Sequence, residues 1–368
     1  MKKAVAISTV IGVALAGIAF AGSASAEPVS NSYVLVGSDT LQDSVNALIN
    51  GTTATNAPVR LVASSGATVG SFDAFGSPAI QTTPNGAFFG RPAGSSAGVT
   101  ALRASITGVP YSGNTAVPAR VISGQVDIAR SSSGPGGNAN AAGKLVYIPY
   151  ARDAVAYAYK GGSAAWANIT AVQLKQIYDG TLTTIDNLPV HPRLPQSGSG
   201  TRNFFLPAIG YPAGTKDAPA VSNTGNTTAE NDATVLADGD IIPFSVASWV
   251  AQANGVAGVN TTTTASVALG TPLTGTLPFS GTAPALAPNL AYYNDVNFGR
   301  DTYLVVEYAR VNPSDTLTYD AGLATLVGTS AAGLNNFGTL SSTPGAVKKK
   351  FGFLSPSTTT AQRAFATL

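Results

Sequence analysis

The sequence contains no cysteine, and its single histidine is His191. Without cysteine there is no disulfide, no thiol catalysis, no zinc–thiolate site and no lipid-modified cysteine. A Ser–His triad would have to use His191, which lies in an extended segment without a nucleophile-elbow motif nearby. We interpret it as an ordinary loop residue. No group of carboxylates resembles a metal site, so the sequence favours a protein without metal, cofactor or enzymatic activity.

Charge is also scarce, because only 10% of the residues are charged. The 20 basic and 18 acidic side chains become equal in number once Lys2 and Lys3 are set aside. A protein that binds nucleic acid normally carries a basic excess or a basic patch. We therefore do not expect nucleic acid as a partner.

The N-terminus has the order of a secretory signal peptide. Lys2 and Lys3 precede an apolar stretch, Ala4 to Gly22, and Ala24-Ser25-Ala26 is an A-x-A cleavage signal. The alternative is a retained membrane anchor, but the stretch is rich in Ala and Gly and a cleavage site follows it directly. We expect cleavage after Ala26 and release to the periplasm or the exterior, not as a lipoprotein.

Short apolar strands alternate with segments of helical periodicity. The predicted strands are Val34–Val36, Val59–Val62, Gln125–Ala129, Leu145–Tyr150, Ala154–Tyr159 and Thr302–Tyr308. Helices are predicted after Asp39, after Gly94, over Val172–Tyr178, after Ser199 and near Asp320–Leu326, with Asn168-Ile169-Thr170 and Gly180 as the start and stop of the third. Alternation of this kind predicts an α/β fold with mainly parallel sheets.

Three turns rich in Ser, Gly and Thr lie where a strand leads into a helix. The start of a helix offers unpaired N–H groups and partial positive charge, which suit an anion. One such turn is an ordinary helix cap, whereas three of them, with Ser131-Ser132-Ser133 after another strand, favour an anion pocket over chance recurrence in a Ser/Gly-rich chain. The turns are Gly37-Ser38-Asp39-Thr40, Gly94-Ser95-Ser96-Ala97-Gly98 and Gln196-Ser197-Gly198-Ser199-Gly200-Thr201-Arg202.

Two acids and three arginines adjoin these segments. Asp39 and Asp153 form a possible acid/base pair, although helix capping by Asp39 and a salt bridge from Asp153 to Arg152 are the simpler interpretations. Arg130, Arg152 and Arg202 could each fork onto an oxyanion or pair with a protein group. Arg202 is the favoured candidate because it lies in the first turn of its helix. The run Lys348–Lys350 is interpreted as solvated surface.

On these motifs the chain resembles the phosphate-binding members of the periplasmic-type (type II) solute-binding proteins, the receptors of phosphate ABC importers. The three turns occur in the family's order, and the S-G-S-G-T motif is fairly specific to it. The resemblance extends from about residue 33 to residue 205 and is weaker around 241–252 and 297–308. It implies two α/β lobes that close on a ligand by a hinge motion, a possible ABC permease as partner, and a monomer.

The resemblance also implies the ligand contacts. The site residues predicted from the turns and from the family together are Asp39, Thr40, Leu41, Ser95, Ser131, Ser132, Ser199, Gly200, Thr201 and Arg202. Two positions depart from the family, because Ser132 replaces its usual aspartate and Pro195 falls where its arginine precedes S-G-S-G-T. Protonated phosphate needs an acceptor for its O–H, whereas sulfate does not. We therefore expect Asp39 as the replacement acceptor; the alternatives are Asp153 as the acceptor or a loss of this discrimination.

The expected organisation is a signal peptide at 1–26, one lobe from 27–150 plus 291–368, and a second from 151–290 with a Thr/Ala/Gly/Pro-rich insertion around 210–290. A secreted receptor for phosphate or a related oxyanion is the first hypothesis. A secreted structural protein that keeps the fold without binding an anion is the second, and a secreted phosphate-ester hydrolase is the third.

Overall fold

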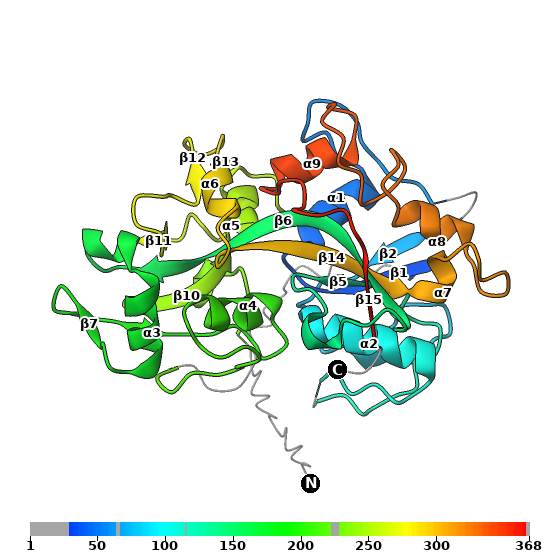
Figure 1. The fold of residues 1–368 in the computed structure, drawn as a ribbon, viewed down its shortest axis with the longest axis horizontal. Coiled ribbons are helices and arrows are strands. Elements are labelled where there is room, and N and C mark those ends of the chain that lie inside the picture. Colours follow the sequence, from blue (N-terminus) through cyan, green and yellow to red (C-terminus); the bar gives the residue numbers. More distant parts are fainter. Residues whose placement is uncertain (1–28, 64–66, 115, 222–227, 366–368) are drawn as a thin grey trace, which may run out of the picture.

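The computed structural model describes residues 29–63, 67–114, 116–221 and 228–365, so the predicted signal peptide lies outside the described residues. Within these ranges no helix is both long and apolar enough to span a membrane. Two lobes lie side by side, and two strands run between them (Figure 1).

The longer of these two strands is β6 (Leu145–Lys160), which has 16 residues. Its first part pairs antiparallel with β14 (Gly299–Glu307) and β15 (Gln362–Ala364) in the first lobe. Its second part pairs antiparallel with β10 (Asp240–Ser245) and β11 (Val267–Gly270) in the second lobe. The two lobes therefore share one sheet through β6.

In the first lobe, β1 (Tyr33–Gly37) lies between β2 (Val69–Ser71) and β5 (Ile128–Ser131), parallel to both, and β14 runs antiparallel to β5. The other elements of this lobe are α1 (Gln42–Asn50), α2 (Ser95–Thr107), α7 (Tyr308–Val311), α8 (Ala321–Leu326), α9 (Pro344–Lys350) and the hairpin of β3 (Ala79–Ile80) and β4 (Phe89–Gly90).

In the second lobe, β9 (His191–Pro192) pairs parallel with β10. The remaining elements are α3 (Ala171–Asp179), α4 (Gly200–Ala208), α5 (Val246–Ala253), α6 (Leu290–Tyr293) and two hairpins, β7 (Thr184–Ile185) with β8 (Leu188–Pro189) and β12 (Phe279–Ser280) with β13 (Ala287–Pro288). The predicted two-lobed α/β fold is confirmed, while the predicted lobe boundaries stay a prediction.

Each lobe has its own apolar core. Leu48 and Leu304 are fully buried in the first lobe, and Phe205 and Ile241 are fully buried in the second. Burying one such side chain contributes about 1.5–3 kcal/mol relative to leaving it exposed. Helix α5 links the two cores, because Ala247 and Ala251 pack into the first-lobe core while Val246 and Val250 pack into the second-lobe core.

Three sequence predictions about strands are wrong. The sheet is mixed and not mainly parallel, because β6 pairs antiparallel with four neighbours. The two strands predicted at 145–150 and 154–159 are one, because β14 continues its pairing across the polar residues Arg152 and Asp153. The strand predicted at Val59–Val62 is reduced to an isolated bridge between Thr52 and Val59.

The predicted solvated surface at Lys348–Lys350 is wrong for Lys348. Its Nζ donates to the carbonyl oxygens of Tyr150 at 2.6 Å and Leu334 at 3.1 Å, and it lies over the rings of Tyr150 and Phe337. Burial lowers the pKa of Lys348 well below its ordinary value. The first residue of this basic run is therefore part of the packing of α9 against β6.

Candidate functional site

The starts of α2 and α4 meet between the two lobes, on the same side of β6 and β14 (Figure 1). The backbone N–H of Ser96 donates to the carbonyl oxygen of Gly198 at 3.2 Å, which joins one lobe to the other. A Cβ added to Gly200 would lie 2.3 Å from Ser132 Oγ and 2.4 Å from Ser95 Oγ. A side chain at this position would force the two serine hydroxyls to move, so the two helix starts are in direct contact.

Ser95 and Ser132 form a buried pair on the first-lobe side of this contact. Ser132 N–H donates to Ser95 Oγ at 3.0 Å, and the two hydroxyl oxygens are 3.1 Å apart. Ser95 is the first residue of α2, and Ser132 directly follows β5. The predicted second turn and the serine run after the strand are therefore brought together.

The start of α4 supplies the second-lobe side. Ser199 is the N-cap, and its Oγ accepts from Arg202 N–H at 3.0 Å. Thr201 is fully buried, and its Oγ1 accepts a hydrogen bond from Arg300 Nη2 at 2.9 Å. The third predicted turn is thus a well-formed helix start with a guanidinium beside it.

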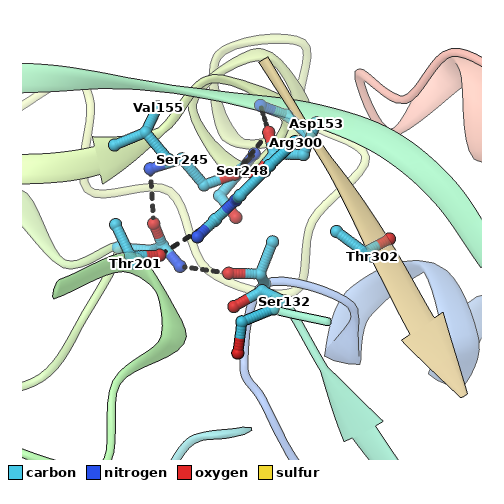
Figure 2. A network of polar contacts seen from close by, with 12 residues as sticks. Ser132, Asp153, Val155, Thr201, Ser245, Ser248, Arg300 and Thr302 are labelled. Carbon is cyan, nitrogen blue, oxygen red and sulfur yellow. Dashed lines mark hydrogen bonds and ion pairs between the residues drawn. The ribbon is translucent and has the colours of Figure 1, made fainter. Parts of the chain in front are cut away.

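Arg300 reaches this point from β14, where it pairs in register with Asp153 of β6. Its Nε and Nη2 donate to Asp153 Oδ2 at 3.1 and 2.8 Å, and Figure 2 shows its side chain extending from Asp153 toward Thr201, with Ser132 nearby. Arg300 is 4% exposed, and its buried Nη1 has no protein partner. Nε and Nη2 of the guanidinium are therefore held by protein oxygens, and Nη1 remains available to a ligand.

The carboxylate of Asp153 accepts hydrogen bonds from two other residues besides Arg300. Its carboxylate accepts from Ser245 Oγ at 3.0 and 2.9 Å and from the N–H of Ala247, in the first turn of α5, at 3.0 Å. A carboxylate at a helix start is favoured by the helix dipole. Together with Arg300, these donors satisfy the carboxylate oxygens of Asp153 and fix the orientation of the guanidinium.

The first turn contributes a second group of polar residues. Asn231 of the second lobe donates through Nδ2 to Asp39 Oδ2 at 3.1 Å and to Thr40 Oγ1 at 3.3 Å, and its Oδ1 accepts from Ser245 N–H. Asp39 Oδ1 and both carboxylate oxygens of Glu230 are buried without a protein donor. Burial and the adjacent Glu230 carboxylate raise the pKa of Asp39 well above its ordinary value.

A family model described as the PBP superfamily domain matches residues 22–327, which is most of the chain. The chain belongs to the PBP superfamily. Its fold is accordingly the mixed α/β fold of periplasmic binding proteins. A search of curated proteins found no match.

Several solved structures are similar to this PBP superfamily protein at low identity. An ABC-type phosphate transport receptor from Vibrio cholerae has 16% identity and a TM-score of 0.47, covering 88% of this chain and 100% of that one. A phosphate-binding protein from Stenotrophomonas maltophilia has 12% identity and a TM-score of 0.48, covering 89% and 91%. A putative phosphate ABC transporter substrate-binding protein from Clostridium perfringens has 15% identity and a TM-score of 0.46, covering 77% and 90%.

The PBP fold brings most of the predicted contact residues together, but three of them are used elsewhere. Leu41 packs into the first-lobe core, and Ser131 Oγ donates to the carbonyl oxygen of Ser133. Arg202 donates to the carbonyl oxygens of Pro195 and Lys216. Its guanidinium is thus occupied by its own lobe and is not the one beside Thr201.

The simpler interpretations of Asp39 and Asp153 are also wrong. Asp39 is not a side-chain cap, because Leu41 is the N-cap of α1 and no side chain caps it. Arg152 pairs with Asp301 at 3.1 Å, not with Asp153. Successive side chains of a strand point to opposite faces, so neighbours on β6 have different partners.

Arg130 lies on β5 and has a structural role, because it supports the first turn, Gly37-Ser38-Asp39-Thr40. Its guanidinium donates to the carbonyl oxygens of Ser38 and Phe72 and to Ser71 Oγ. Burial lowers the pKa of Arg130 to about 10, so it stays charged at neutral pH. It fixes the loop that carries Asp39.

Sequence reasoning missed Arg300, Glu230, Asn231 and Ser245. The only local signal for Arg300 was its place before the predicted strand at 302–308, and Glu230 lies in the least regular stretch of the sequence. Among the described residues there is no group of three or more potential metal ligands. The site is therefore built from hydroxyls, backbone N–H groups, one guanidinium and carboxyl groups.

Proposed function

We propose that this protein binds a tetrahedral oxyanion of the phosphate type between its lobes. The observation that carries the proposal is the buried Nη1 of Arg300, which has no partner and lies on the guanidinium that contacts Thr201. Leaving a buried donor unpaired costs about 1–3 kcal/mol. An oxyanion oxygen at this point would accept that hydrogen bond and lie at the start of α4.

The charges around the site favour a ligand that carries a proton. Asp153 neutralises Arg300, so the site has no excess positive charge to offer a fully deprotonated anion. The free oxygens of Asp39 and Glu230 are acceptors. Phosphate can donate an O–H to them, whereas sulfate at neutral pH has none and would be repelled.

The cellular role we propose is that of a secreted receptor. The signal-peptide pattern at residues 1–26 supports export, and the PBP superfamily fold supports capture by closure of two lobes. A receptor of this kind would act as a monomer and would hand its ligand to an ABC permease. No enzymatic step is part of the proposal.

Calorimetric titration of the purified protein with phosphate, sulfate and molybdate tests this function. We expect heat and saturation with phosphate and weaker or no binding of sulfate. If none of the three anions binds, the proposed function is wrong. Equal affinity for phosphate and sulfate would support an anion site but would show that Asp39 and Glu230 do not accept a hydrogen bond from the ligand.

A further inference from the structure

Two carboxyl groups from different lobes lie next to each other where the lobes meet. Asp39 lies in the turn between β1 and α1, and Glu230 lies in the second-lobe segment before β10. The two side chains are within hydrogen-bonding reach, and Glu230 is only 2% exposed. Glu230 has no counterpart among the contact residues that the sequence predicted.

The oxygens of this pair leave room for one proton between them. Asn231 donates to Asp39 Oδ2, while Asp39 Oδ1 and both Glu230 oxygens are buried without a donor. Two ionised carboxylates in contact repel each other strongly when they are buried. A single proton turns one of them into a donor and satisfies an oxygen of the other.

The surrounding charges do not remove the need for that proton. Arg130 attracts Asp39, but it is shared with Asp43 and Asp73, and its N–H groups are held by Ser38, Ser71 and Phe72. Arg300 is paired with Asp153. Among the described residues, neither Asp39 nor Glu230 takes part in an ion pair.

We propose that Glu230 is a specificity-determining residue that holds one shared proton with Asp39 across the closed cleft, so that the protein takes up a proton when it binds its oxyanion. This inference rests on the proposed function, since closure on a ligand brings the two lobes together. In the open cleft the two carboxyls would be separated and solvated. Each would then be ionised at neutral pH.

The sign of the pH dependence follows from linkage. The pKa of Asp39 is raised in the closed protein, so closure is favoured at low pH and loses this contribution as the pH rises through the raised pKa. Between about pH 4.5, just above the ordinary carboxyl range, and the raised pKa, closure takes up one proton. Affinity should therefore fall about tenfold per pH unit in that window.

The test is calorimetry with inorganic phosphate at about pH 6, above the ordinary carboxyl range, in buffers of different ionisation enthalpy. We expect the wild-type protein to take up about one proton more than Glu230→Gln, because the Gln amide donates to Asp39 Oδ1 without needing a proton. Asp39→Asn replaces the other carboxyl of the pair and should reduce proton uptake by the same amount. It serves as the second variant if Glu230→Gln does not fold. Comparing variants at one pH cancels the ionisation of phosphate itself.

Asp238→Asn is the matched control, because this second-lobe carboxyl has a side chain that is 83% exposed and should leave proton uptake unchanged. Phosphate binding with equal proton uptake in the wild type, Glu230→Gln and Asp39→Asn overturns this inference and leaves the proposed function standing. Absence of phosphate binding by the wild-type protein overturns both.

Discussion

At the scale of single residues, the proposed anion site depends most on Arg300. Its contacts with Asp153 join positions that are 147 residues apart in the sequence. In the phosphate receptors that the sequence resembles, an arginine precedes the S-G-S-G-T motif, and here Pro195 lies at or near that position. Arg300 brings a guanidinium from β14 to the start of α4. Its Nε and Nη2 both donate to Asp153 Oδ2, which restricts the side chain, so little side-chain entropy remains to be lost when a ligand binds.

Replacing Arg300 by Gln should weaken phosphate binding by about 10- to 100-fold, because a hydrogen bond to a charged group contributes about 1.5–3 kcal/mol. Calorimetry measures the loss, and Arg120→Gln, which changes an exposed first-lobe arginine, is the control. Circular dichroism melting shows whether the variant folds despite the unpaired Asp153. If it does not fold, Thr201→Val removes the hydroxyl that Arg300 contacts and should also weaken binding. Wild-type affinity in folded Arg300→Gln would contradict the assigned role.

At the scale of elements, the local signals were reliable for α3, α4 and α8 but not for α1, which Asp39 does not cap. Thr170 caps α3 in a capping box and Gly180 ends it in the left-handed conformation, as the sequence predicted. Ser199 caps α4 and Asp320 caps α8, and in each case the side-chain oxygen accepts from a backbone N–H of the first helical turn. Such signals lie within a few residues of one another, so a single sequence contains them.

The pairing of distant elements was not predictable in the same way. Nothing within a few residues of Asp153 specifies that β14 will place Arg300 opposite it, and nothing near Glu230 points to Asp39. Both contacts depend on strand register and lobe packing. The sequence therefore predicted the helix starts of the site and its two aspartates, but not Arg300 and Glu230, with which those aspartates interact.

The contact between the two helix starts leads to a prediction about Gly200. An alanine fits the helical backbone at this position, but its Cβ would lie 2.3 Å from Ser132 Oγ and 2.4 Å from Ser95 Oγ across the cleft. Gly200→Ala should therefore hinder closure and weaken phosphate binding more than tenfold, a loss of about 1.4 kcal/mol or more, with little change in the melting temperature of the ligand-free protein. Gly137→Ala, at a position with open space around it, is the control. Unchanged affinity in Gly200→Ala would show that the lobes do not close on this contact.

At the scale of the whole molecule, the two lobes meet along a continuous polar network and through α5, which packs into both apolar cores. The contacts run from Asp39 through Asn231 and Ser245 to Asp153, and from there through Arg300 to Thr201. Hydrogen bonds across an interface exchange readily with water when lobes separate, whereas apolar cores do not. The polar part of this interface, on the side of β6 and β14 where the starts of α2 and α4 meet (Figure 1), therefore suits lobes that open and close there.

The most direct measurement is a crystal structure of the protein grown with arsenate, a phosphate analogue whose arsenic is located by anomalous scattering. We predict arsenic between the lobes, with arsenate oxygens accepting from Arg300 Nη1 and from the start of α4 at Thr201, and an arsenate O–H directed toward the Asp39–Glu230 pair. A cleft without arsenate, or arsenate bound only at other positions, would contradict the account.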